Sequence, residues 1–391
     1  MSILLLIMGL VLLVLLVVVH EFGHFLAARR NGVVVEEFGI GFPPRAIAKK
    51  LKSGLILTLN WLPLGGFVKL KGEHDSDTAK GSYGAASLSA KTKIMLAGVG
   101  MNLLVAVVLL TIVAWMGMPQ LSKDFVCNQF TIKSDEHIAS NSKNNNAETV
   151  SDVFKGSPAE RAGLKDGDQI LALAGKNVTC HSVLVSTARA NAGNTVNILI
   201  KRGTTLENKN ITLNTVKAAN NNSFIGIGTI SGGGGGLQVV RYTWSAPVVA
   251  VGTSAQMTAL TLKGLGQSLK GLGSLMAGLV TNNRAARQSG QTQATQNVSG
   301  PVGIFFIFKD GSNLGVGFIL FIVAIISLTL AIINILPIPA LDGGRLFMTY
   351  LFRAMRRPLP KKTEELINFV GFIVLMVLVV LITIVDLHRR H

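Results

Sequence analysis

Hydrophobic residues along this chain gather in four long runs, with polar stretches between them. The runs cover about 3–28, 94–118, 315–336 and 366–387. Because a helix needs roughly 20 apolar residues to cross the hydrocarbon core of a bilayer, each run predicts a membrane-spanning helix. The pattern therefore predicts an α-helical polytopic membrane protein with four transmembrane helices.

The first run carries ionisable residues before it ends. No charged or strongly polar side chain occurs in residues 3–19, but His20, Glu21 and His24 follow while the run continues. Each such group costs on the order of 2.5–3.5 kcal/mol at the centre of a membrane span, and less near the interface. Three of them close together are typical of a functional site.

The spacing of these three residues indicates a metal. Residues four apart share one helix face, so His20 and His24 can present two imidazoles to one ion. Glu21 stands where its carboxylate can reach a water on that ion, as the general base of a zinc hydrolase does. Zinc also needs a third protein ligand and an open position for water. The alternative is a chance pentapeptide, or histidines that hydrogen-bond to neighbouring helices.

The third run ends in a segment that breaks its helix. Pro337 and Pro339 remove backbone donors after Asn334, and the two glycines after Asp342 free the backbone. Such an end would let Asp342 turn towards the two histidines. The alternatives are a salt bridge from Asp342 to Arg345 and a helix-terminus cap at Asn334.

The motifs HEFGH in the first run and NILPIPALDGG after the third resemble the site-2 proteases, the intramembrane zinc metalloproteases. The resemblance is greatest to the bacterial PDZ-containing branch, the regulator-of-sigma-E proteases, which cleaves anti-sigma factors and remnant signal peptides. It implies that Asp342 is the third Zn²⁺ ligand and that Asn334 and Pro337 contact the substrate. It also implies a zinc metalloendopeptidase that cleaves single-span membrane proteins within or near their transmembrane segments.

The second run contains Gly98, Gly100 and Asn102. Small residues let helices approach closely, and an asparagine can hydrogen-bond between helices, so the pattern favours helix packing. A role for Asn102 near the metal is the alternative.

Residues 33–72, between the first two runs, have the composition of short strands and turns. β-Branched and aliphatic residues are interrupted by glycines and prolines, including Gly65 and Gly66. The matching family segment is a membrane-dipping β-hairpin region that pairs with the unwound substrate, so the resemblance implies substrate binding at Gly65 and Gly66 by strand addition. An ordinary cytoplasmic hairpin is the alternative.

The polar stretch between the second and third runs predicts a separate domain. Ser157, Pro158 and Glu160 have the pattern of a capped helix start, a second helix is expected at 181–192, and strands are expected at QILALA, TVNILIKRG, NITLNTV and FIGIG. SPAERAGLKDGDQIL resembles a PDZ domain, which implies one extracytoplasmic PDZ-like α+β domain at 125–230. Its expected function is to select partners or substrates, by adding a strand of the partner to its sheet or by binding the partner's C-terminus. A steric filter against bulky substrates is the alternative.

Residues 231–314 begin with a glycine-rich linker and continue with apolar residues at helical spacing. This pattern predicts an amphipathic helix within 239–285 on the outer face of the membrane. Cys127 and Cys180 could form a disulfide in an exported segment, and the sequence leaves their state open. The expected domains are 1–118, 125–230, 231–314 and 315–391.

Positive charge is in large excess, with 37 Lys and Arg against 20 Asp and Glu and a net charge of +17. No basic run is interleaved with aromatic residues, so the surplus favours anionic membrane lipids and not nucleic acid. Lys and Arg are concentrated in the loops after the first and third runs, which places those loops in the cytoplasm and 119–314 outside. The prediction is a multi-pass protein of the bacterial cytoplasmic membrane with its active site towards the cytoplasm.

Two other functions compete with proteolysis. A catalytically inactive scaffold could use the PDZ-like domain for partner binding, but a purely structural metal site has no need of the base Glu21. A zinc transporter would be expected to carry several intramembrane ligand sets along a pathway, whereas this sequence offers one.

Overall fold

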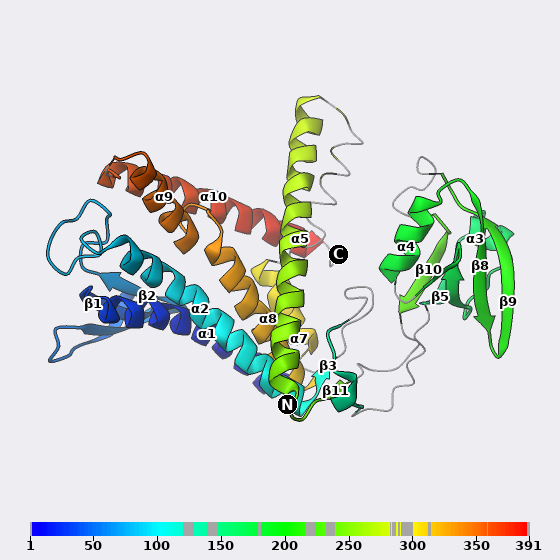
Figure 1. The fold of residues 1–391 in the computed structure, drawn as a ribbon, viewed down its shortest axis with the longest axis horizontal. Coiled ribbons are helices and arrows are strands. Elements are labelled where there is room, and N and C mark those ends of the chain that lie inside the picture. The colour runs from blue at the N-terminus through cyan, green and yellow to red at the C-terminus, as the bar shows by residue number, and fades with distance from the viewer. Residues whose placement is uncertain are drawn as a thin grey trace. The chain divides into compact units, whose positions relative to one another are not determined.

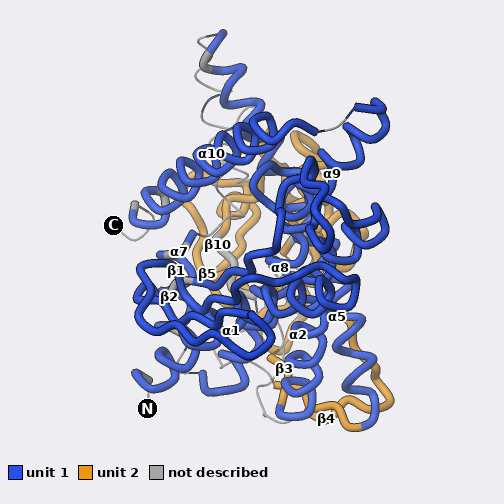
Figure 2. The backbone as a smooth tube through the Cα atoms, turned by 90° about the vertical axis from the view of Figure 1, so that its left-hand side faces the viewer, with its two compact units in different colours: residues 1–116, 244–391 blue, residues 117–243 orange. Residues whose placement is uncertain are grey.

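The structure is a computed structural model that describes residues 2–119, 129–138, 148–178, 181–215, 224–231, 239–281, 283, 287, 290, 300–311, 314–357 and 359–388. The chain divides into two compact units, which are Met1–Met116 with Trp244–His391, and Gly117–Thr243 (Figure 2). Cys127 and Cys180 lie outside the described residues, so the predicted alternatives for them stay open.

Long apolar helices build the first unit. They are α1 (Ser2–Arg30), α2 (Leu88–Met116), α5 (Ala246–Val280), α7 (Pro301–Gly311), α8 (Val316–Ile335), α9 (Asp342–Ala354) and α10 (Lys361–His388) (Figure 1). Within the described residues, four segments are long and apolar enough to cross a membrane: Ile3–Arg30, Leu88–Met116, Val316–Ile335 and Lys361–Ile384. They coincide with the four predicted runs, which confirms the prediction of a helical membrane protein.

Helix α2 packs against both α1 and α8 (Figure 1). The contact with α1 is close because Gly23 has no side chain: a Cβ there would stand 2.5 Å from the carbonyl oxygen of Ala97. On the α8 side, the Ser327 hydroxyl donates a 2.8 Å hydrogen bond to the backbone carbonyl of Asn102, and both residues are buried. Helix α2 therefore joins the helix that carries the histidines to the helix that leads to Asp342.

The chain between α1 and α2 forms two antiparallel strands, β1 (Val35–Lys50) and β2 (Ile56–Leu70). Each strand takes part in two pairings, because Phe38 of β1 lies opposite both Leu57 and Val68 of β2. Residues 66–70 consequently form one edge of the sheet, beside α1 (Figure 1). The strands predicted for this region are confirmed, and their depth in the membrane stays a prediction.

The helix predicted within 239–285 forms α5. Its first turns are buried at Ala246, Val249, Ala250 and Thr253, where the helix packs against α2 and α8. Its place at the outer face of the membrane stays a prediction.

The second unit is an α+β domain. Its main sheet has the order β10 (Ile227–Ser231), β5 (Glu148–Val153), β6 (Gln169–Leu173), β8 (Thr195–Arg202) and β9 (Thr205–Thr212), with β7 (Lys176–Asn177) paired to β6. All of these pairings are antiparallel. Its helices are α3 (Pro158–Arg161) and α4 (His181–Ala190), and a smaller sheet has the order β3 (Met118–Pro119), β11 (Val239–Arg241) and β4 (His137–Ile138). β6 and β8 lie at the strands predicted for 169–174 and 195–203, and α3 and α4 lie at the two predicted helices. β9 ends at Thr212 and overlaps only the start of the strand predicted for 210–216, β10 overlaps only the end of the predicted 224–228, and β5 has no predicted counterpart.

Local polar contacts stabilise the second unit. The backbone N–H of Glu160 donates to Ser157 Oγ at 3.2 Å, as the predicted cap of α3 requires. Asp168 is fully buried, and Arg202 donates two hydrogen bonds of 2.7 Å to its carboxylate. Burial alone would raise the pKa of Asp168, but the bonds from Arg202 outweigh it and hold the pKa below its usual value.

Candidate metal centre

The two histidines of α1 lie on one face of the helix and are both buried, with ring centroids 4.8 Å apart. The ring of His24 is fixed by its Nδ1–H, which donates to the backbone carbonyl of Ile94 on α2 at 2.7 Å. A carbonyl oxygen can only accept, so Nε2 of His24 keeps its lone pair. The two Nε2 atoms, of His20 and His24, are 3.1 Å apart.

Asp342 reaches the histidines because the chain turns sharply after α8. Helix α9 begins at Asp342, and the next residue packs against the end of α8 so closely that a Cβ on Gly343 would stand 2.3 Å from the carbonyl oxygen of Ile335. Oδ2 of Asp342 lies 3.0 Å from Nε2 of His20 and 3.2 Å from Nε2 of His24. Helix α8 therefore ends before Asp342 and the chain turns this residue towards the histidines, as the prolines and glycines of the segment predict.

The salt bridge considered between Asp342 and Arg345 is not formed. Arg345 lies with its Nε 3.3 Å from a carboxylate oxygen of Glu364 on α10, and its guanidinium stacks on the ring of Tyr83. The carboxylate of Asp342 is thus in contact with the two histidines and not with Arg345.

These three side chains have the separations expected of metal ligands. Ligand atoms about 2.0–2.2 Å from a tetrahedral ion stand roughly 3.3–3.6 Å apart, and the observed separations of 3.0 to 3.2 Å are only slightly shorter. Lone pairs so close together repel one another unless a proton or a metal cation lies between them. In the described part of the chain, His20, His24 and Asp342 form the one group of three or more His, Cys, Asp or Glu residues so placed.

Gly98 of α2 leaves the space that such a cation needs. A Cβ at this position would stand 2.5 Å from Nε2 of His24 and 2.7 Å from Nε2 of His20. Any other residue would therefore fill the point on which the ligand atoms converge. One signal for this role is visible in the sequence, a glycine within an apolar span, but the interpretation as helix packing did not assign it to the metal site.

Charge at the centre also suits a cation. An aspartate side chain has an ordinary pKa of about 3.9, and a cation held beside it would favour the ionised carboxylate further. Two neutral imidazoles and one carboxylate would leave Zn²⁺ a net charge of about +1.

Glu21 lies beside the three ligands. It lines a cavity of about 130 Å³, which is large enough to hold water. The backbone N–H of Val68, on the β2 edge, donates to its carboxylate. The cavity is lined by Glu21, His24, Val68, Leu70, Glu73, Met95, Asp342 and Arg345.

The predicted substrate-binding residues divide into two groups. Gly66 lies against the base, since a Cβ there would stand 3.6 Å from Glu21 Cγ, and Gly65 has a φ of +91°, which only glycine adopts readily. Asn334 is half-buried and Pro337 is exposed, and neither lines the cavity. The structure brings Gly66 to the base, with Gly65 next to it in the chain, but does not bring Asn334 or Pro337 there. The substrate role of all four residues stays a prediction.

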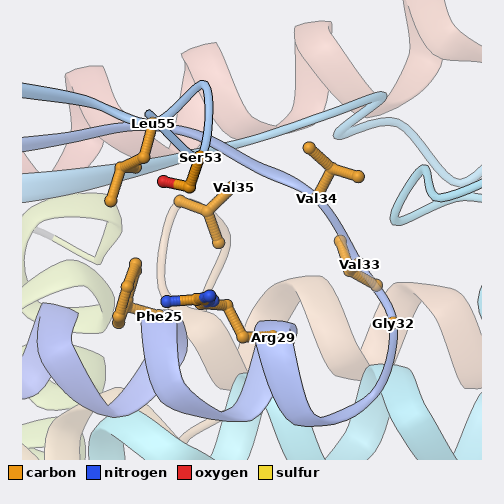
Figure 3. A pocket seen from close by; sticks show the side chains of 8 residues that line it. All are labelled: Phe25, Arg29, Gly32, Val33, Val34, Val35, Ser53 and Leu55. Carbon is orange, nitrogen blue, oxygen red and sulfur yellow. The ribbon is translucent and has the colours of Figure 1, made fainter. Parts of the chain in front are cut away.

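A second cavity, of about 270 Å³, lies between the end of α1 and the strands (Figure 3). Arg29 is the one charged side chain in its wall, and the lining contains no His, Cys, Asp or Glu. It is therefore not a second metal site. Its lining residues are Phe25, Arg29, Gly32, Val33, Val34, Val35, Ser53 and Leu55.

Residues 8–378 match the family model described as Peptidase family M50. The chain belongs to this family. A protein of Clostridium perfringens with a provisional zinc metalloprotease name is 30% identical over 357 residues, which cover 91% of this chain and 90% of the relative. Zinc metalloprotease RasP of Bacillus licheniformis is 25% identical over 91% of this chain and 92% of its own.

The predicted membership of the site-2 proteases is thus confirmed, and the zinc metalloprotease names of the relatives support Zn²⁺ as the cofactor of this M50 protein. Among solved structures, the PDZ domain of an SdrC-like protein from Listeria monocytogenes is 23% identical, covering 22% of this chain and 88% of that one, with a TM-score of 0.19. A score this low does not decide the fold of the second unit.

Proposed function

We propose that this M50 protein is an intramembrane zinc metalloendopeptidase, which hydrolyses peptide bonds within or near the transmembrane segments of membrane proteins. The observation that carries the proposal is the convergence of His20, His24 and Asp342 beside Glu21, on helices apolar enough to cross a membrane.

His20, His24 and Asp342 would hold the zinc, with Gly98 leaving its space. When bound, zinc supplies a Lewis acid that polarises the scissile carbonyl and lowers the pKa of a water to ~7. Glu21 takes a proton from that water and later gives it to the leaving amine. The N–H of Val68 keeps the Glu21 carboxylate turned towards the cavity where this water would lie.

The edge of β2 offers a place for the substrate backbone. The N–H groups of Val68 and Leu70 point away from β1, because they donate to the side chains of Glu21 and Glu73. Alternate residues of a strand point the same way, so the N–H of Gly66 also lies on this free edge. A substrate helix must unwind before zinc can reach its carbonyls, and pairing with this edge would replace the hydrogen bonds that it loses.

The proposed setting is the bacterial cytoplasmic membrane, with the metal centre towards the cytoplasm and the second unit outside. The excess of Lys and Arg in the loops after the first and third spans supports this orientation. Single-span proteins such as anti-sigma factors or remnant signal peptides are the proposed substrates, in contact with anionic lipids. The second unit, as a PDZ-like domain, would select or exclude them.

An inactive scaffold is less well supported. Glu21 is present, and it lines a cavity with room for water next to two of the ligands. A zinc transporter is also less well supported, because the described residues hold a single ligand set.

Replacing Glu21 by Gln tests the proposal. The variant should bind one zinc, because Glu21 is not a ligand, but should cleave a membrane-spanning model peptide about 10²- to 10⁴-fold more slowly, since it loses its general base. Glu36→Gln is the matched control: this side chain lies on the surface, 3.4 Å from Lys69, and the change should leave cleavage intact. Undiminished cleavage by purified Glu21→Gln protein would overturn the proposal.

A further inference from the structure

The ring of His20 touches α2 through its other nitrogen. Nδ1 of His20 lies 3.1 Å from the side-chain amide of Asn102, and both residues are almost fully buried, with exposed fractions of 6% and 1%. The contact is shielded from solvent, so the orientation of the amide and the tautomer of His20 depend on each other.

The contact can be made in two ways. If the amide NH₂ donates to a bare Nδ1, the proton of the neutral ring is on Nε2, the atom that faces Asp342 and His24. Nε2 is then unable to bind a metal. If instead Nδ1–H donates to the amide oxygen, Nε2 keeps its lone pair and can be a ligand.

The geometry permits the second arrangement, and the neighbouring ring favours it. Turning the amide by half a turn brings Oδ1, which has no hydrogen-bond partner while the NH₂ faces His20, to Nδ1, and puts the NH₂ in its former place. The neighbouring ring follows the same rule, since Nδ1–H of His24 donates to the carbonyl of Ile94. Both rings then present Nε2 to the same point.

We propose that Asn102 is a positioning residue of the metal centre, whose amide oxygen accepts from Nδ1–H of His20 and fixes its tautomer and orientation. The inference rests on the proposed zinc site and deepens it. Asn102 does not touch the substrate or the reacting atoms in this account.

The face of α2 that packs against His20 and His24 carries three residues that contact these rings. Ile94, Gly98 and Asn102 follow one another at intervals of four residues, the same interval as His20 and His24 on α1. Ile94 supplies an acceptor for the ring of His24, Gly98 leaves a gap at the converging Nε2 atoms, and Asn102 supplies an acceptor for the ring of His20. The backbone of Asn102 is itself held by the Ser327 hydroxyl of α8.

The test is the zinc affinity of the purified full chain, measured by competition with a chelator. Asn102→Leu has similar volume but no acceptor, and it should bind zinc about 10- to 100-fold more weakly, as loss of a ligand-orienting partner does elsewhere. Asn102→Asp can accept from Nδ1–H but has no NH₂ to donate, and it should bind zinc within a few-fold of the wild type or more tightly. Gly100→Ala is the control on the same helix, because a Cβ there meets nothing within 4 Å, and its zinc affinity should stay within a few-fold.

Three results would overturn the inference. They are wild-type affinity in Asn102→Leu, equal loss in Asn102→Asp and Asn102→Leu, and an equal loss in Gly100→Ala, because each would leave the acceptor oxygen without a specific role. Should Asn102→Leu fail to fold, Asn102→Ala replaces it in the comparison with Asn102→Asp. A wild-type protein that binds no zinc would instead remove the proposed function on which the inference rests.

Discussion

At the scale of single residues, the centre depends as much on a missing side chain as on the ligands. The Nε2 atoms of His20 and His24 would each lie within 2.7 Å of a Cβ on Gly98. A methyl group there would stand at the point where the two Nε2 atoms converge. The glycine is therefore a functional residue, although it carries no reactive group.

Gly98→Ala should abolish zinc binding and cleavage, because its Cβ would fill the metal position. Alanine is a better helix former than glycine by about 1 kcal/mol, so weaker helix formation would not explain the loss. The measurement is metal content by elemental analysis of the purified protein.

Gly100→Ala is the matched control on the same helix, since a Cβ there meets nothing within 4 Å. It should keep both zinc and activity. A Gly98→Ala protein that binds zinc as the wild type does would contradict the proposed position of the ion.

At the scale of elements, the edge of β2 connects the base to the proposed substrate. The strand holds Glu21 through Val68 and leaves the N–H of Gly66 on its free side, two residues away. One strand would thus orient the catalytic group and align the substrate.

Gly66→Pro should reduce cleavage by at least tenfold with zinc content unchanged, because proline has no N–H to offer a paired substrate strand. Proline is tolerated at sheet edges, but any Cβ at position 66 would stand 3.0 Å from the backbone carbonyl oxygen of Gly39, so Gly66→Ala is the control for this contact. The measurement is the initial rate of cleavage of a membrane-spanning peptide, with zinc content as the control. Normal cleavage would exclude strand pairing at this position.

The second unit should lose stability in acid. Asp168 is fully buried against Arg202, and its pKa in the folded chain is below the unfolded value of about 3.9. Its contribution to the free energy of unfolding is therefore complete above about pH 4 and is lost as the pH falls through the folded pKa.

Hydrogen exchange of β6 and β8 in the full chain measures this effect. Asp168→Asn should weaken protection at pH 7 by roughly 1–3 kcal/mol and should remove its part of the acid dependence. Identical protection in the two proteins at pH 7 would show that the pair does not stabilise the unit.

At the scale of the whole molecule, the sequence predicts the parts that depend on local patterns. Apolar runs predict the four spans, and the interval of four residues predicts that His20 and His24 lie on one face of α1. The prolines and glycines around Asp342 predict the end of α8 and the turn of the chain after it. The roles of Gly98 and Asn102 depend on which helix packs against α1, and no local pattern encodes that choice. For the same reason Arg345, a neighbour of Asp342 in sequence, pairs with Glu364 of α10.

The central claim is that His20, His24 and Asp342, from opposite ends of the chain, bind one zinc ion. X-ray absorption at the zinc edge, on purified wild-type and Asp342→Ala proteins, tests it most directly. We expect one zinc per wild-type chain with nitrogen and oxygen ligands at about 2.0–2.2 Å and no sulfur, and a clear loss of zinc from Asp342→Ala. Full zinc content with an unchanged spectrum in Asp342→Ala would contradict the account.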